Sequence, residues 1–212
     1  MFARVARASY PLALAVDAAT ALGLAPRHEQ RTLAMRRTFQ ERTGSFGPED
    51  PWFDMRSRAF WDDALTRQGF AAHVVDELPD EAKPWARVMG RSHRGLFYAS
   101  TSQAGRLVRD LWGGAEFLVD EVDDAMRTAL DAPSGPFDGR LAALASPVCV
   151  GLLPGALFHP EDAAESIERV LDAARERGMA TDEVLDALLR MELSLRSLSR
   201  VKPAYAYRLE AL

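Results

Sequence analysis

The chain has 212 residues, of which 48% are hydrophobic and 27% are charged, and it carries a formal net charge of −5. This composition excludes a disordered polar chain, and the acidic balance argues against a protein that coats nucleic acid or an anionic membrane, because both need a basic surface. No apolar stretch approaches the roughly 20 residues of a membrane-spanning helix, so we expect no membrane association.

The single cysteine, Cys149, excludes an internal disulfide and a cluster of thiolates around a metal. A reducing cytoplasm is the expected location. An apolar run near the N-terminus has the general form of a secretion signal, but Pro11 precedes it and Asp17 interrupts it. Arg supplies nearly all of the positive charge, which together with the abundance of Ala is typical of a GC-rich bacterial genome.

Helical patterns dominate the first 92 residues. One helix is bracketed by Pro11 in its first turn and Gly23 at its end, and an arginine-rich helix follows over residues 27–43. Asp50, directly before a proline, predicts the N-cap of a third helix that runs to about Gln68. This third helix is unusually aromatic, which indicates that more than one of its faces is covered.

Two further segments complete this N-terminal part. Residues 70–78 fit either a short strand or another helical turn, because the apolar run is too short to decide. Pro79 and Asp80 then predict the start of another helix, which ends near Gly90.

The pattern changes after Gly95, where short apolar groups alternate with Gly and Pro. Three of these groups, separated by turn residues, predict an antiparallel meander, and two more follow a helical segment at residues 122–130. Five strands of this length predict a small, twisted sheet or a half-barrel. The five predicted strands are residues 96–98, 107–108, 117–119, 139–145 and 147–153.

The C-terminal part is again helical. One helix carries Glu161 and Asp162 in its first turn, where they complement the helix dipole, and it ends at Gly178. The last helix begins at Thr181 and is too apolar for a solitary surface helix. It must either pack between two layers or present one face to a partner.

These elements predict one α+β domain over residues 1–212. A small antiparallel five-stranded meander or half-barrel, in the β-rich core at residues 93–160, is flanked by N-terminal helices within residues 1–92 and C-terminal helices within residues 161–212.

Catalytic candidates are few. His159 and Glu161 lie at the expected junction between a strand and the following helix, where catalytic groups are often found. His93 precedes the first strand. This arrangement offers a hydrolase with a His and carboxylate site as an alternative function. A structural interpretation is that His159 caps the helix. Cys149 lies between two valines and is expected to be buried and unreactive.

No nucleotide, metalloprotease or zinc-ribbon motif occurs in the chain, and we expect no cofactor. The acidic run at residues 120–124 lacks the spacing of a calcium loop, so no metal site is predicted there. The densest basic group consists of Arg27, Arg31, Arg36, Arg37 and Arg42, of which Arg27, Arg31 and Arg42 share one side of a helix. Nucleic-acid binding through this helix is a third candidate function, but no DNA-binding or RNA-binding pattern surrounds it, and nucleic acid is not the expected partner.

The function favoured by the sequence is that of a non-enzymatic cytoplasmic interaction or regulatory protein. Its partner would be another protein or a second copy of itself, bound through aromatic and apolar helical surfaces. Aromatic residues are enriched in interface hot spots. The residues expected to bind this partner are Trp52, Phe53, Trp61, Leu195, Tyr205 and Tyr207.

Overall fold

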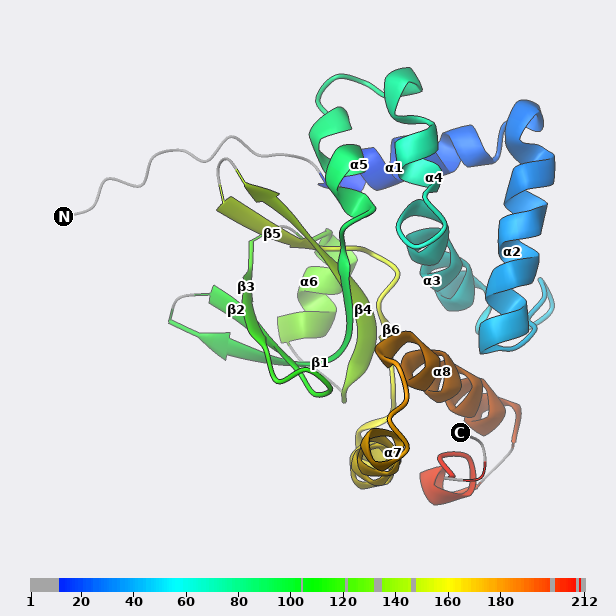
Figure 1. Cartoon of the computed structure of the whole chain (residues 1–212), viewed down its shortest axis with the longest axis vertical. Helices are drawn as coiled ribbons and strands as arrows, with labels where there is room; N and C mark the ends of the chain where they lie inside the picture. The colour runs from blue at the N-terminus through cyan, green and yellow to red at the C-terminus, as the bar shows by residue number, and fades with distance from the viewer. Residues whose placement is uncertain are drawn as a thin grey trace.

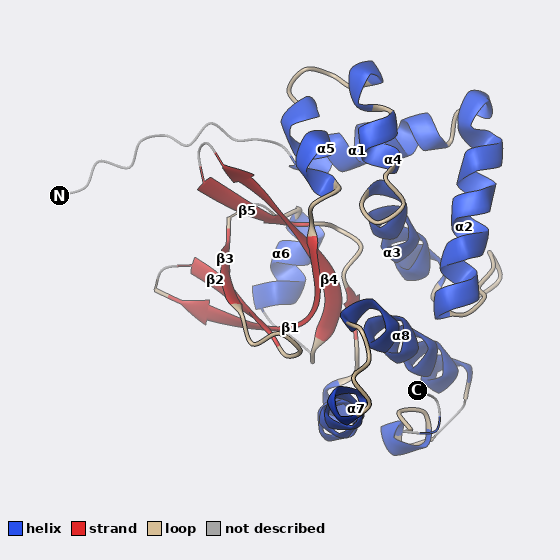
Figure 2. Ribbon diagram, viewed as in Figure 1, coloured by secondary structure: helices blue, strands red, loops and turns tan. Residues whose placement is uncertain are grey.

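Helices flank a six-stranded antiparallel sheet, which confirms the α+β class (Figures 1 and 2). Most helices gather on one side of the sheet, whereas one short helix lies inside the curve of the sheet. The computed structural model describes residues 12–103, 105–120, 122–131, 135–145, 148–198, 201–208 and 210. The expected helix start at Pro11 and the expected turn at residues 146–147 lie outside this range.

The N-terminal helices bury their apolar faces against each other and against one face of the sheet. Phe60, Phe70 and Trp85 are fully buried at the centre of this layer, together with Cys149 from the sheet, which confirms that the cysteine lies in the core. The elements are α1 (Leu12–Gly23), η1 (Pro26–His28), α2 (Glu29–Thr43), α3 (Phe53–Leu65), α4 (Phe70–His73), η2 (Val75–Glu77) and α5 (Lys83–Met89).

Several predicted boundaries in this layer were wrong. Asp50 does not cap α3, because its Oδ2 accepts a hydrogen bond from the Gly47 backbone N–H at 2.7 Å. The helix ends at Leu65 rather than near residue 68. Directly after this end, the hydroxyl of Thr66 donates to the backbone carbonyl of Asp62. The undecided segment at residues 70–78 forms the helical turns α4 and η2, and α5 begins later than predicted.

The sheet has the strand order β3-β2-β1-β4-β5, with β6 paired to β4. The meander of β1, β2 and β3 was predicted, whereas the two-residue strand β6 is too short to leave a pattern in the sequence. The strands are β1 (His93–Ser102), β2 (Gly105–Asp110), β3 (Glu116–Val119), β4 (Phe137–Ala145), β5 (Val148–Leu152) and β6 (Leu157–Phe158).

Strong curvature brings the two edge strands together at one end of the sheet. The backbone N–H after β3 donates to the carbonyl of Val150 in β5 at 2.8 Å, although the sheet is not a closed barrel. α6 (Asp124–Asp131) lies inside this curve (Figure 1). Gly95 and Gly139 face each other in β1 and β4, and a Cβ on either would crowd the ring of Phe97 or Phe137.

The C-terminal helices are α7 (Ala164–Glu176) and α8 (Thr181–Ser197), preceded by η3 (Glu161–Ala163) and followed by η4 (Pro203–Tyr205). α8 contacts α7, α2 and β1, which accounts for its apolar character on more than one face. Within the described part of the chain, no helix has the length and apolarity needed to cross a membrane.

A buried ion-pair network joins the three parts of the fold. Arg94 in β1 donates to Asp138 in β4 at 2.8 Å and to Asp186 in α8 at 2.6 Å. Burial lowers the pKa of Arg94, but the two carboxylates outweigh it and hold that pKa above its ordinary value. Asp63 extends the network through contacts to Arg42 and Arg140 at 2.6 Å each, and the more exposed Arg67 and Asp182 join it at its edge.

Candidate functional site

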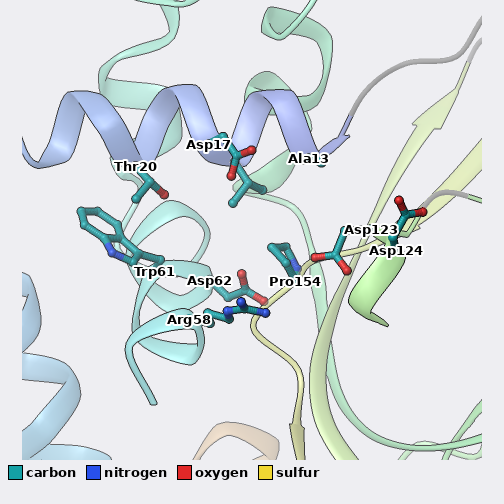
Figure 3. Close-up of a pocket in the computed structure, with 10 residues that line it drawn as sticks. Ala13, Asp17, Thr20, Arg58, Trp61, Asp62, Asp123, Asp124 and Pro154 are labelled. Atoms are coloured by element: carbon teal, nitrogen blue, oxygen red, sulfur yellow. The ribbon is translucent and has the colours of Figure 1, made fainter. Parts of the chain in front are cut away.

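A pocket of about 340 Å³ opens between α1, α3, the start of α6 and the segment after β5 (Figure 3). Its size falls within the range of small-molecule sites. We call it the acidic pocket, because four of its lining residues are aspartates. The lining residues are Ala13, Val16, Asp17, Thr20, Arg58, Trp61, Asp62, Asp123, Asp124 and Pro154.

Asp62 is the most unusual residue of the acidic pocket. The residue is only 1% exposed, and its Oδ2 accepts a hydrogen bond from the backbone N–H of Gly155 at 2.8 Å. Its Oδ1 is also buried and has no hydrogen-bond partner among the described residues. An unsatisfied buried oxygen is costly, so it needs an explanation.

Burial raises the pKa of the Asp62 carboxyl to about 8, although Arg140 and the Gly155 N–H act in the opposite direction. The carboxyl therefore keeps its proton at neutral pH. Because Oδ2 faces an N–H donor, Oδ1 is the oxygen that carries this proton. The side chain thus offers a neutral O–H group to the pocket.

Gly155 is what allows the backbone to approach this carboxyl. A Cβ at Gly155 would lie 2.4 Å from the carbonyl oxygen of Arg58 and 2.6 Å from Cγ of Asp62. Only glycine fits so close to α3. The close approach both supplies the N–H donor and seals Asp62 from water on that side.

The other acids of the pocket remain accessible at its rim. Figure 3 shows Asp17 extending from α1, and Asp123 directed toward Pro154 and Asp62. Oδ1 of Asp123 accepts from the Met126 N–H at 2.6 Å and so caps α6, which leaves its other oxygen for the pocket. Asp17 and Asp124 are exposed.

Arg58 is the one cation among the described residues that line the acidic pocket. Its side chain is exposed and, among the described residues, makes no hydrogen bond or ion pair. Asp17, Asp123 and Asp124 therefore outnumber this one guanidinium, although Asp124 also forms an ion pair with Arg127 at 2.9 Å. A site with this balance attracts a positively charged ligand.

His159, a catalytic candidate from the sequence, is buried and lies outside the acidic pocket. Its Nδ1 is 2.7 Å from the hydroxyl of Tyr207, and its Nε2 is buried without a hydrogen-bond partner in the described structure. Burial lowers the pKa of the ring to about 4, so the ring is neutral at physiological pH. His159 does not cap the following helix, whose N-cap position belongs to Pro160.

The other two catalytic candidates are placed apart from His159. Glu161 is exposed in η3, and within the described residues no hydrogen bond or ion pair connects it with His159. His93 is paired with Asp110, with 2.9 Å between Nε2 and Oδ2. Asp110 is buried and also accepts the N–H of Trp112, so this pair holds the turn between β2 and β3.

The residues predicted to bind a protein partner occupy different environments. Trp52, Phe53 and Trp61 are partly buried against the helical core, and Trp61 also lines the acidic pocket. Tyr207 is buried, whereas Tyr205 is 65% exposed. Leu195 is partly buried against the core around α7 and α8. Binding of a protein partner stays a prediction.

The arginines considered for nucleic acid also diverge. Arg27 forms an ion pair with Glu77, and Arg31 is exposed on α2. Arg42 is half-buried in the ion-pair network through Asp63 and Asp186. The structure therefore does not bring the three arginines together as one free basic surface.

Asp62 and Gly155 were not identified as site residues from the sequence. One signal was available: α3 is covered on more than one face, so the adjacent Asp62 and Asp63 cannot both be solvated. Both are buried. Their partners lie far away in the sequence, and no local pattern shows them.

No group of three or more His, Cys, Asp or Glu side chains among the described residues is arranged to hold a metal ion. Comparisons with models of known protein families, with curated proteins and with solved structures find no match to this chain.

Proposed function

We propose that the protein binds a small organic amine in the acidic pocket. The observation that carries this proposal is the buried Oδ1 of Asp62, which lines the pocket and lacks a partner. Once Oδ1 has lost its proton, an ammonium group placed beside it can donate the missing hydrogen bond. Hydrogen bonds of this charge-assisted kind are stronger than neutral ones.

The electrostatics of the pocket support the same ligand class. Asp17, Asp123 and Asp124 surround the entrance and attract a cation. A bound ammonium lowers the pKa of Asp62 and favours its charged form. Binding near neutral pH then releases the Asp62 proton, because that pKa is about 8 in the free protein.

This interpretation also explains why a costly residue occupies this position. A buried carboxyl without a complete set of partners destabilises the fold, and such strain is common where binding requires it. The proposal keeps the non-enzymatic class favoured by the sequence and adds a small-molecule ligand.

The test compares butylamine with butanol and butyrate, which match its size but are neutral or anionic. Titration calorimetry at neutral pH, in two buffers of different ionisation enthalpy, measures affinity and proton release. Butylamine should bind and release up to one proton, whereas butanol and butyrate should not bind. Asp62→Asn should weaken butylamine binding by about tenfold or more and abolish the proton release.

Asp76→Asn is the matched control, because Asp76 is exposed in η2 and does not line the pocket. It makes the same replacement of a carboxyl by an amide, outside the pocket, and should leave binding unchanged. Equal binding of butylamine and butanol, or unchanged binding in Asp62→Asn, would overturn the proposal.

A second candidate function is acid catalysis by the Asp62 carboxyl. A carboxylic acid that stays protonated near neutral pH within a pocket is suited to donate a proton to a leaving group. Turnover of a panel of chromogenic glycosides and esters that disappears in Asp62→Asn but persists in Asp76→Asn would support it. No turnover by the wild-type protein, with butylamine binding intact, would remove it.

A further inference from the structure

A second hollow adjoins the acidic pocket and is mainly apolar. Its volume is about 350 Å³, and it shares Arg58 and Pro154 with the acidic pocket. We call it the apolar hollow. Its lining residues are Asp54, Met55, Arg58, Met126, Ala129, Pro154, Ala156 and Phe158.

The two spaces follow the same face of α3. Met55, Arg58 and Asp62 are spaced by three and four residues, so they lie on consecutive turns of one helix face. The seven steps along the chain from Met55 to Asp62 span about 10 Å along the helix axis. α6 forms the opposite wall of both spaces, with Asp123 at the acidic end and Met126 and Ala129 at the apolar end.

We infer that the ligand is an amphiphilic amine, with its ammonium group at Asp62 and its apolar tail in the hollow beside Met55, Met126 and Phe158. This inference rests on the proposed function, because the acidic pocket holds the head group. Charge favours this orientation: four aspartates line the acidic pocket, whereas the described lining of the apolar hollow has Asp54 alone as a carboxylate beside Met, Ala and Phe side chains.

Arg58 lines both the acidic pocket and the apolar hollow, so it lies at the junction that the tail must cross. Its aliphatic stem can lie along an alkyl chain while the guanidinium stays in water. The guanidinium is exposed and makes no ion pair among the described residues, so nothing there fixes it across the junction.

The experiment measures the affinity of ethylamine, butylamine, hexylamine and octylamine for the full chain by titration calorimetry. Each methylene buried in the hollow should tighten binding by up to about fourfold. Octanoate, with the same tail and the opposite charge, should bind far more weakly than octylamine.

Ala129→Trp tests the hollow directly. Ala129 is half-buried in the lining of the hollow, and a tryptophan there fills the space without changing charge. The gain in affinity with chain length should disappear in this variant, while ethylamine binds as it does to the wild type. Ala34→Trp, at an exposed position on α2, is the control for the introduced ring.

The outcomes separate the two proposals. If short amines bind in an Asp62-dependent manner without any gain from chain length, the tail site is refuted and the amine pocket stands. If a gain with chain length persists in Ala129→Trp, the tail lies elsewhere and the inference fails. If no amine binds, or if Asp62→Asn binds octylamine as the wild type does, the proposed function fails as well. If Ala129→Trp instead changes the oligomeric state, a second copy of the chain covers the hollow and the inference is overturned.

Discussion

Replacing Asp62 by asparagine should stabilise the protein relative to the wild type, and this advantage should grow as the pH rises. In the unfolded chain, an aspartate titrates near its ordinary value of 3.8, whereas the pKa of the buried carboxyl is about 8. Between these values the folded protein holds a proton that the unfolded chain has lost. The contribution of Asp62 to stability therefore falls with rising pH across this window, by about 1.4 kcal/mol per pH unit.

His159 has the opposite effect in the acidic part of the window. Burial holds the pKa of its ring at about 4, below the ordinary value of 6.5, so the unfolded chain binds the extra proton between these values. Its contribution to stability is present at pH values above 6.5 and is lost as the pH falls toward 4. The contributions of Asp62 and His159 cancel in this range, and only the loss due to Asp62 remains between pH 6.5 and 8.

The difference between Asp62→Asn and the wild type isolates Asp62, because all other titrating groups are shared. This difference in the free energy of unfolding should grow by about 2 kcal/mol from pH 6.5 to pH 8 in favour of the variant. Urea unfolding at a series of pH values measures it. Asp76→Asn, at an exposed site, should give a flat difference curve. A flat curve for Asp62→Asn as well would refute the reasoning, since it would mean that Asp62 is ionised in the folded protein.

Three further substitutions test the contacts around the site and the core. Gly155→Ala should cost about 1–3 kcal/mol and weaken butylamine binding, because its Cβ would lie 2.6 Å from Cγ of Asp62. Asp186→Ala should cost about 3–5 kcal/mol, because it removes a carboxylate that the guanidinium groups of Arg94 and Arg42 share. Tyr207→Phe should cost about 1–3 kcal/mol, because it removes the 2.7 Å hydrogen bond to His159. Urea unfolding measures all three changes in stability.

Each control uses a residue of the same type in an open position. Gly90→Ala should be nearly neutral, since a Cβ there meets no atom within 4 Å. Asp172→Ala breaks an exposed pair with Arg175 and should cost less than about 1 kcal/mol. Equal losses in Gly155→Ala and Gly90→Ala, or in Asp186→Ala and Asp172→Ala, would contradict the structural explanations. A Tyr207→Phe variant as stable as the wild type would show that the His159 contact contributes nothing.

The sequence predicted the fold where local patterns determine it. The strands at residues 96–98, 107–108 and 117–119 were visible because Gly and polar residues separate their apolar groups, and they lie in β1, β2 and β3. The apolar character of the last helix predicted either packing between layers or a face for a partner, and in the structure α8 contacts α7, α2 and β1. The cap at Asp50 failed because a nearer backbone N–H, that of Gly47, binds its carboxylate.

The acidic pocket was not predictable in the same way. The environment of Asp62 depends on Gly155, which is 93 residues away in the sequence. A periodic pattern reports which face of a helix is apolar, but it does not report which loop will cover that face. The burial of Asp62, and hence its proton, follows from that covering loop.

The buried ion-pair network has a consequence for how the protein opens. Asp186 binds Arg42 across 144 residues of sequence and Arg94 across 92 residues. Detaching α2 alone would strand Asp63 and Asp186 without one of their cations, at a cost comparable to the stability of a domain. α2 and α8 should therefore unfold in a single cooperative event. The amide protons of the two helices should exchange with solvent at a common free energy. Exchange of α2 well before α8 would show that the network does not couple them.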